Sequence, residues 1–411
     1  MSRSECQARD ERDPLAPLRH QFYLPEGLIY LDGNSLGALP LAVSECLRTT
    51  LEREWGSDLI GSWNAHDWIG LPERLGNMIA PLIGAASGQV IVADSVSVNL
   101  FKLLSAGLNL KPGRTTVLST TDNFPTDLYM AQGLAEMLGD QRCVLQTVGR
   151  TELVDGINET TAIVLLTHVD FRSGRMFDMS ELTRAAQQRG ALVLWDLSHS
   201  VGAVPLTLDA DRVDMAVGCG YKYLNGGPGA PAFLYLAERH HIEARQPLAG
   251  WMGHADPFAF SPDYTQAPAM QGFLTGTPPV LAYRALEAAL AVWGSVSIQQ
   301  VRRKSVELAE LFVALVDETS TLDELELRSP RHAADRGSHV AFAHPSGYSI
   351  MQALIDRKVV GDFREPDLLR YGFAPLYVRY VDVWDAVAVL RDVIETRIYE
   401  APRYSVRGAV T

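Results

Sequence analysis

The sequence predicts an α/β protein, in which helices flank a mostly parallel sheet and a smaller α+β domain follows at the C-terminus. From Leu71 onward, short apolar runs alternate with stretches of helical spacing, which is typical of parallel sheets with connecting helices. Residues 191–194 are apolar at every position, which predicts a strand buried on both faces. After residue 280 the helix and strand patterns occur in mixed order, which predicts the α+β domain.

Length and composition limit the class of protein. With 411 residues, 47% of them hydrophobic, the chain can form one large domain and a smaller one. A net charge of −13 argues against a nucleic-acid partner, which needs clustered positive charge. No run approaches about 18 consecutive apolar residues, and residues 1–14 lack the apolar core of a signal peptide, so we expect no membrane partner and a cytoplasmic location.

The four cysteines show neither metal-ligand spacing nor the density of a disulfide scaffold, so we expect reduced thiols and no metal. The expected division of the chain is a flexible arm (1–13), an N-terminal segment that wraps the active site (14–70), a large domain (71–280), and bridging helices with a small domain (281–411). Trp63 and Trp68 could face an aromatic substrate, but core packing is favoured for at least one of them.

The large domain is expected to hold a regular series of elements. Strands are predicted over 89–93, 116–119, 161–167, 191–195 and 231–236, and helices after residue 94, after residue 124 and over 179–189. Val96 and Ser97 come where the first of these helices begins, and free N–H groups at a helix N-terminus bind anions. The alternative is an ordinary serine cap. Thr126 and Asp127, taken alone, would also read as a helix cap.

Two polar residues stand out because each follows a predicted buried strand. Asp196 ends the run 191–195, and Lys222 follows the apolar run 213–217 and precedes a loop rich in glycine. Ligands of open α/β sheets bind at the carboxyl ends of strands. A carboxylate can pair with a cationic ring nitrogen, and a desolvated lysine can hold an aldehyde, so the pair predicts a pyridoxal phosphate site. Taken singly, the lysine could lie at the surface and the aspartate could cap a helix.

Four motifs extend this interpretation. They are Leu31-Asp32-Gly33-Asn34-Ser35-Leu36-Gly37, Phe124-Pro125-Thr126-Asp127, Asp196-x-x-His199, and Tyr221-Lys222-Tyr223-Leu224-Asn225-Gly226-Gly227-Pro228-Gly229. In this order and spacing the sequence resembles the kynureninase family from about Leu15 to the C-terminal region. The resemblance implies a pyridoxal phosphate enzyme of aminotransferase-like fold, with the cofactor in the large domain. It further implies a homodimer with its active site at the interface, which hydrolyses L-kynurenine to anthranilate and L-alanine in tryptophan catabolism.

The same resemblance implies roles for individual residues. The implied cofactor contacts are Val96 (through its backbone), Ser97, Phe124, Pro125, Thr126, Asp127, Thr167, Asp196, His199, Tyr221, Lys222, Trp251 and Thr277. Phe124 is expected to cover the ring face, and Asp127 to lie near the ring nitrogen beside Asp196. Trp251 and Thr277 are expected at the phosphate, partly supplied across the dimer interface. Several relatives carry a hydroxyl residue where Val96 stands, so only a backbone contact is expected there.

Catalytic and substrate-binding residues are implied as well. Lys222 and Tyr221 are the expected proton carriers, with Asp196 as the third catalytic residue. Arg370 is the candidate for the substrate α-carboxylate, because a guanidinium fork matches a carboxylate, and Ser35 is a second substrate-binding candidate. The alternative for Arg370 is an ordinary surface salt bridge.

Two other functions remain open from the sequence. A cysteine desulfurase or class V aminotransferase would share the lysine and the aspartate, but a desulfurase needs a reactive cysteine on a mobile loop, and none of the four cysteines is so placed. A non-enzymatic binder of nucleotide phosphates could use the loop 226–229 as a cradle. That loop lacks the lysine followed by serine or threonine of a P-loop. The choice between L-kynurenine and 3-hydroxykynurenine is not encoded in any recognisable motif.

Overall fold

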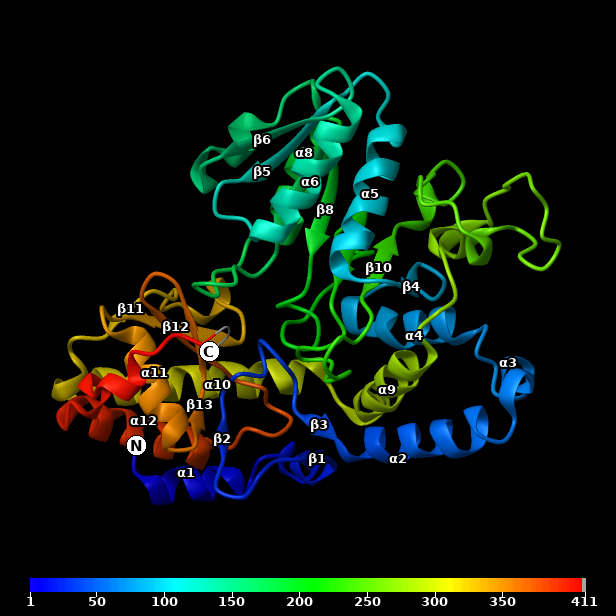
Figure 1. Cartoon of the computed structure of the whole chain (residues 1–411). Helices are drawn as coiled ribbons and strands as arrows, with labels where there is room; N and C mark the ends of the chain where they lie inside the picture. Colours follow the sequence, from blue (N-terminus) through cyan, green and yellow to red (C-terminus); the bar gives the residue numbers. More distant parts are fainter. Residues whose placement is uncertain (409–411) are drawn as a thin grey trace.

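The computed structural model describes residues 1–408, and its centre is a seven-stranded sheet (Figure 1). In spatial order the strands are β4 (Val90–Val92), β10 (Phe233–Leu236), β9 (Met215–Gly218), β8 (Leu192–Asp196), β7 (Thr161–Thr167), β5 (Thr116–Thr120) and β6 (Val144–Val148). The neighbours from β9 to β6 are parallel, and β10 is antiparallel to both β9 and β4. The predicted α/β class with a mostly parallel sheet is confirmed.

Several helices of this half surround the sheet. They are α4 (Leu71–Ile79), α5 (Val96–Leu110), α6 (Pro125–Leu138), α8 (Met179–Gln188) and α9 (Val280–Leu290). Of these, α5, α6 and α8 lie where helices are predicted. α8 is capped at its N-terminus by Asp178, whose side chain accepts a hydrogen bond from Glu181 N, and it ends before Gly190, which has a positive φ of 81°. Every residue of β8 is buried, as the unbroken apolar run predicts, and the helices of this half lie around the sheet (Figure 1).

The C-terminal part has its own antiparallel sheet. Its strand order is β11 (Glu326–Leu327), β12 (His339–Ala343), β15 (Leu368–Gly372) and β14 (Asp362–Arg364). The helices beside it are α10 (Ile298–Asp317), α11 (Gly347–Asp356) and α12 (Tyr380–Glu395). This mixture confirms the expected α+β character. Neither α12 nor the edge strand β6 is predicted from the sequence.

The N-terminal residues form a helix, α1 (Arg3–Asp10), where a loose arm is expected. Ser2 and Glu5 make a capping box at its start, and Cys6 is fully buried. α1 packs against α12, to which Arg3 is bonded through Asp385 at 2.7 Å (Figure 1). The charged composition suggests a loose arm, but Arg3 forms an ion pair with a helix residue 382 positions later in the sequence.

Residues 22–55 cross from one half of the molecule to the other. β1 (Phe22–Tyr23) pairs with β3 (Leu39–Pro40), and β2 (Ile29–Tyr30) pairs in parallel with β13 (Val359–Val360) beside the small sheet. α2 (Leu41–Thr49) continues as a π-helix over Thr50–Trp55. This path carries the segment 31–37 between the small sheet and the large domain.

Trp63 and Trp68 pack edge to face with ring centroids 5.8 Å apart. Trp68 is buried, and its Nε1 donates to Glu54 Oε2 at 2.9 Å. The burial of Trp68 confirms the expectation that at least one of the two tryptophans belongs to the core. The bond to Glu54 gives its indole N–H the partner that a buried N–H group needs.

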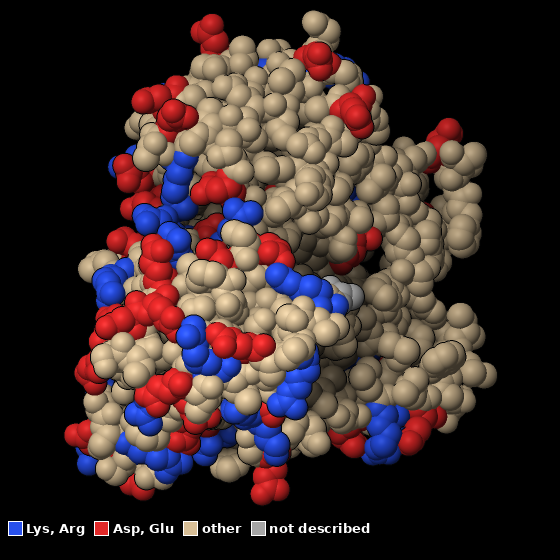
Figure 2. Space-filling view, turned by 60° about the vertical axis from the view of Figure 1, so that its left-hand side comes forward, with Lys and Arg blue, Asp and Glu red and all other residues tan. Residues whose placement is uncertain are grey.

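On the face drawn in Figure 2, acidic and basic side chains are interspersed, and no broad area is basic alone. Among residues 1–408, no helix is long and apolar enough to cross a membrane.

Candidate active site

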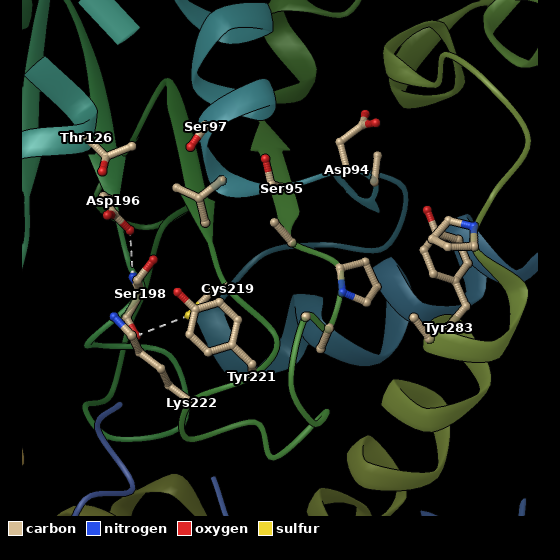
Figure 3. Close-up of a pocket in the computed structure, with 18 of the residues that line it drawn as sticks. Asp94, Ser95, Ser97, Thr126, Asp196, Ser198, Cys219, Tyr221, Lys222 and Tyr283 are labelled. Atoms are coloured by element: carbon tan, nitrogen blue, oxygen red, sulfur yellow. Dashed lines mark hydrogen bonds between the residues drawn. The ribbon is translucent and has the colours of Figure 1, made fainter. Parts of the chain in front are cut away.

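A cavity of about 670 Å3 lies at the carboxyl ends of β7, β8 and β9 and at the start of α5 (Figure 3). The structure brings many of the expected site residues together in its wall: Val96, Ser97, Phe124, Thr126, Asp127, Thr167, Asp196, His199, Tyr221, Lys222 and Thr277. These residues come from separate loops because parallel strands end at one edge of the sheet. Pro125, Trp251, Ser35 and Arg370 are not among the residues that line it.

Lys222 lies in the loop after β9 and is half-buried. Its Nζ is 2.9 Å from His199 Nε2. Burial, and next the charge of Lys222, lower the pKa of His199 well below its ordinary value. His199 is therefore neutral, and its Nε2 can accept a hydrogen bond from the Lys222 amine, so it orients Lys222 without competing for the positive charge.

Two buried carboxyl groups lie together opposite the lysine. Asp196, at the end of β8, accepts a hydrogen bond from Ser198 N at 2.7 Å, and Asp127 accepts one from Thr167 Oγ1 at 3.0 Å. Burial raises the pKa of Asp196, and burial followed by the charge of Asp196 raises the pKa of Asp127 well above its usual range. Asp127 Oδ1 has no hydrogen-bond partner among the described residues.

This arrangement fits the ring nitrogen of pyridoxal phosphate. Two neighbouring carboxyl groups in a buried site cannot both ionise at low cost without a positive partner. A protonated ring nitrogen would supply that positive partner, and the unpaired Oδ1 of Asp127 marks a polar position that a bound group would satisfy.

The start of α5 forms another wall of the cavity. The helix cap is Ser95, whose Oγ accepts a hydrogen bond from Val98 N at 3.3 Å, so the capping alternative for Ser97 does not apply. Ser97 lies in the first turn, where backbone N–H groups are free of helical partners. Figure 3 shows Ser95 and Ser97 at the top of the cavity. Such a site fits a phosphate group.

Phe124 stands directly before α6, and Pro125 is the first residue of that helix. The ring of Phe124 packs edge to face against Phe171 at 5.1 Å, and both rings line the cavity. Asn123 Oδ1 accepts a hydrogen bond from Thr167 N at 2.9 Å, which ties this turn to the end of β7. Pro125 fixes the turn and does not itself line the cavity.

Tyr221 lies beside the lysine, with its ring centroid 5.9 Å from Lys222 Nζ (Figure 3). Burial raises the pKa of Tyr221, so its hydroxyl stays protonated and can donate. The backbone of Tyr221 is held from the other side, because Gly37 N donates to Tyr221 O at 2.8 Å.

Arg370 and Ser35 lie just outside the cavity wall. Arg370 is 1% exposed, so the expected alternative of a surface salt bridge does not describe it. Its Nε donates to Asp362 Oδ1 at 2.7 Å, and its Nη1 donates to the carbonyl oxygen of Phe171, a residue that lines the cavity. Ser35 Oγ donates to Asp362 Oδ2 at 2.7 Å.

Trp251 lies away from this chain's own cavity. It is 37% exposed and packs against Phe258 and Phe260 at 5.7 and 6.4 Å between ring centroids. The loop that carries these rings projects from the side of the molecule (Figure 1). Trp251 does not line the cavity, although Met252 next to it does.

Three residues of this region carry no signal that the sequence analysis used. Ser198 and Cys219 line the cavity, and both lie within three residues after a predicted buried strand, which is a usable signal. Burial raises the pKa of the free Cys219 thiol, so it is not an activated thiolate. His339 of β12 is buried with its ring 5.5 Å from His199, and neither of its ring nitrogens has a partner among the described residues. No local sequence pattern indicates that His339 lies near the site.

Within residues 1–408, no group of three or more His, Cys, Asp or Glu side chains is arranged to hold a metal ion.

Comparison with known proteins adds independent evidence. The model of the kynureninase C-terminal domain family matches residues 301–390. A kynureninase from Burkholderia pseudomallei is 49% identical over 415 residues, which covers 100% of both chains. Among solved structures, the apo cysteine desulfurase from Thermococcus onnurineus superposes with a TM-score of 0.78 at 18% identity, covering 92% of this chain and 98% of that one.

A second solved structure is a mutant of C-DES with glycine covalently linked to its PLP cofactor, with a TM-score of 0.78 at 17% identity, covering 91% of this chain and 99% of that one. These structures share the fold of this chain, and its site, with Lys222 after β9, Asp196 at the end of β8 and Asp127 in the first turn of α6, fits the class of pyridoxal phosphate-dependent enzymes. The full-length match at 49% identity narrows the class further. The chain belongs to the kynureninase family, and the cysteine desulfurases are distant relatives that share its fold.

Proposed function

We propose that this protein hydrolyses the Cβ–Cγ bond of L-kynurenine, or of 3-hydroxykynurenine, to give anthranilate or 3-hydroxyanthranilate and L-alanine. The observation that carries the proposal is the meeting of Lys222, Asp196 and Asp127 in one cavity of a chain that is 49% identical to a kynureninase. When bound, pyridoxal phosphate supplies an aldehyde that joins an amine and a ring that withdraws electrons from the substrate.

The chain supplies the groups that hold this cofactor. Asp196, with Asp127 beside it, keeps a proton on the ring nitrogen, because a carboxylate stabilises the protonated ring. Phe124 lies against the ring face. Backbone N–H groups at Val96 and Ser97, with the Ser97 hydroxyl, bind the phosphate at the start of α5. The other contacts that we assign are Thr126, Thr167, His199 and Thr277 of the cavity wall, with Trp251 supplied by the partner subunit. Pro125 contributes only by fixing the turn that carries Phe124.

Lys222 and Tyr221 move the protons. Lys222 Nζ removes the α-proton of the substrate, and His199 accepts a hydrogen bond from the same amine and so orients it. Water adds to the γ-carbonyl carbon, the Cβ–Cγ bond breaks, and Cβ receives the electron pair and one proton. The protonated Tyr221 hydroxyl is the nearby donor for that proton.

Arg370 is the residue that we assign to the substrate carboxylate, with Ser35 beside it. A guanidinium is the usual partner of a carboxylate in a buried place. The hydrogen bond from Arg370 to the carbonyl oxygen of Phe171 supports the assignment. Phe171 lines the cavity, so Arg370 lies directly behind a residue of the cavity wall.

The active protein is a homodimer in this proposal, with the site at the interface. Trp251, Phe258 and Phe260 form an exposed aromatic cluster on a projecting loop, and exposed apolar clusters mark contact surfaces. Dilution should therefore reduce cofactor affinity together with activity, as followed by size-exclusion chromatography and absorbance. A monomer with full activity would contradict this arrangement.

We assign a role to each successive part of the chain. Residues 71–280 form the cofactor-binding domain, 281–411 the bridging helices and small domain, and 14–70 the segment that wraps the site. We place the protein in the cytoplasm, where it would act in tryptophan catabolism. We assign it neither a membrane partner nor a nucleic-acid partner.

The decisive experiment is steady-state turnover of L-kynurenine and 3-hydroxykynurenine by the purified protein, with the products identified. We expect an aminobenzoate product and L-alanine in equal amounts. Release of sulfide from L-cysteine without either product would favour a desulfurase. A protein that stays colourless with added pyridoxal phosphate would exclude both enzymes and favour a simple phosphate binder.

A further inference from the structure

Asp362 is a buried carboxylate that lies outside the cavity and has no role in the proposed chemistry. It belongs to β14 and stands directly opposite Arg370 of β15 in the antiparallel register. Asp362 is 2% exposed. Although burial opposes its ionisation, the hydrogen bonds and the charge of Arg370 lower the pKa of Asp362, so it is a carboxylate at neutral pH.

The contacts of Asp362 decide which nitrogen of Arg370 lies against the cavity wall. Arg370 donates from Nε to Oδ1 at 2.7 Å and from Nη2 to Oδ2, so one edge of the guanidinium is occupied. Its Nη1 points the other way and donates to the carbonyl of Phe171, in the cavity wall. The edge that faces the substrate side is therefore the Nη1 edge.

Asp362 also holds a second arginine and a serine. Arg364 Nη2 lies 2.8 Å from Oδ2, and Ser35 Oγ donates to the same oxygen at 2.7 Å. Two guanidinium groups so close together repel each other unless a carboxylate lies between them. Removal of the Asp362 charge would therefore turn Arg364 and Arg370 apart.

The serine links this cluster to the catalytic lysine. Two residues after Ser35, Gly37 N donates to Tyr221 O at 2.8 Å. A Cβ atom at Gly37 would lie closer to Lys222 O than any carbon can approach, which shows how tightly the two backbones pack. A chain of direct contacts thus runs from Arg370 through Asp362 and Ser35 to the Lys222 loop.

We propose that Asp362 is a positioning residue for substrate recognition. By gripping Arg370 and Ser35 at once, it keeps the Nη1 edge of Arg370 turned to the cavity and at a fixed distance from Lys222. The inference rests on the proposed role of Arg370 as the partner of the substrate carboxylate, and it adds a residue that no motif assigns.

The test is Asp362→Asn in the holoenzyme, with Glu365→Gln as the control. Glu365 is an exposed carboxylate on the same hairpin, bonded to Arg407 at 2.9 Å. For Asp362→Asn we expect KM for L-kynurenine to rise about ten-fold or more while kcat changes less than about three-fold, as for a loss of uniform binding. Binding of L-alanine, followed by absorbance of the cofactor, should weaken to a similar degree, and cofactor affinity should be unchanged. Glu365→Gln should match the parent. An unchanged or lower KM for Asp362→Asn would overturn the inference.

Arg370→Gln separates this inference from the proposed function. If Arg370→Gln leaves KM unchanged, the assignment of Arg370 itself fails. If Arg370→Gln raises KM and Asp362→Asn does not, only the positioning role fails. In the double variant the two effects should overlap, with KM near that of Arg370→Gln alone, because residues that act through one another are not additive. Independent, multiplied effects would contradict the proposal.

If Asp362→Asn does not fold, Ser35→Ala provides the same test with a smaller change. It removes one hydrogen bond to Asp362 and keeps the charge, so a rise in KM of about two- to five-fold is expected without loss of cofactor. No change in KM for Ser35→Ala would then count against the contact chain.

Discussion

Lys222 and Asp196 come together because of the pairing of two parallel strands. In the register of β8 with β9, Asp196 lies opposite Val217, so the loop that carries Lys222 leaves the sheet beside the aspartate. Asp127 arrives from a different element, the first turn of α6, and is fully buried. The end of a strand positions Asp196 and Lys222, and the start of a helix positions Asp127. A single substitution at each position therefore tests one side chain.

Lys222→Ala should lower turnover of L-kynurenine by several orders of magnitude, because it deletes the amine that bonds the cofactor and moves the α-proton. Cofactor should still bind through the helix N-terminus and the carboxylates. Lys222→Arg is the matched variant, since it keeps the charge but cannot supply a neutral amine. Turnover and the absorbance spectrum check both. Substantial activity in Lys222→Arg would remove the lysine from the chemistry.

Asp196→Asn should keep the cofactor and its colour and lower kcat, because an amide holds a ring proton less well than a carboxylate. Asp127→Asn, measured beside it, assigns the ring partner. We expect the larger loss of kcat in Asp196→Asn. Near-normal turnover of Asp196→Asn together with a large loss in Asp127→Asn would make Asp127 the partner of the ring.

At the scale of elements, strands buried at every position were predictable, including β4 at one edge of the large sheet, whereas the exposed strand β6 at the other edge was not. β7 and β8 are buried at every position, and their apolar runs identified them. β6 is an edge strand with exposed positions, and its mixed sequence hides it. α1 is short and charged, and its stability depends on α12. The local hydrophobic pattern indicates which elements are buried by their own neighbours. An element that is buried only by a distant partner shows a weaker hydrophobic pattern.

The segment 31–37 offers a test of how elements hold the site. Gly37→Ala should displace the Lys222 loop, because the added methyl group collides with the backbone carbonyl of Lys222 and with Asn225. We expect a lower melting temperature and a changed cofactor spectrum. The control is Gly133→Ala in α6, where nothing lies within 4 Å of the added carbon. An exposed helix should gain about 1 kcal/mol from that change, with the site untouched. Equal behaviour of the two variants would contradict the proposed packing.

At the scale of the whole molecule, two buried charge networks join parts that lie far apart in the sequence. Lys304 of α10 pairs with Asp13 at 2.6 Å, and Arg370 of the small sheet pairs with Asp362 beside Ser35 of the N-terminal segment. Asp32 lies at the second network, where its backbone bridges to Gly372. These contacts tie the N-terminal residues to the C-terminal half.

Asp32 should make stability depend on pH. Burial, and next the charge of Asp362, raise the pKa of Asp32 to about 7. Because this exceeds the value in an unfolded chain, about 4, the stability from the retained proton is full below about pH 4 and is lost as pH rises through about 7.

Asp32→Asn should remove that dependence, so the fall in urea midpoint from pH 5 to pH 8 should be smaller in the variant than in the parent. The exposed Asp140→Asn is the control and should keep the parental slope. If Asp32→Asn and Asp140→Asn lose the same stability between the two pH values, Asp32 is not the group that titrates.

The sequence by itself determined the buried strands of the large sheet and the helices α5, α6 and α8 between them, the placing of Asp196 and Lys222 after strand ends, and the membership of the kynureninase family through motifs. Only the tertiary structure decided which charged groups pair. The grip of Asp362 on Arg370 and Ser35, and the position of His339 beside His199, join residues on separate elements. The physical reason is that periodicity and turn chemistry are local, whereas the partner of a buried charge depends on distances that exist only after the two sheets and the N-terminal segment have packed.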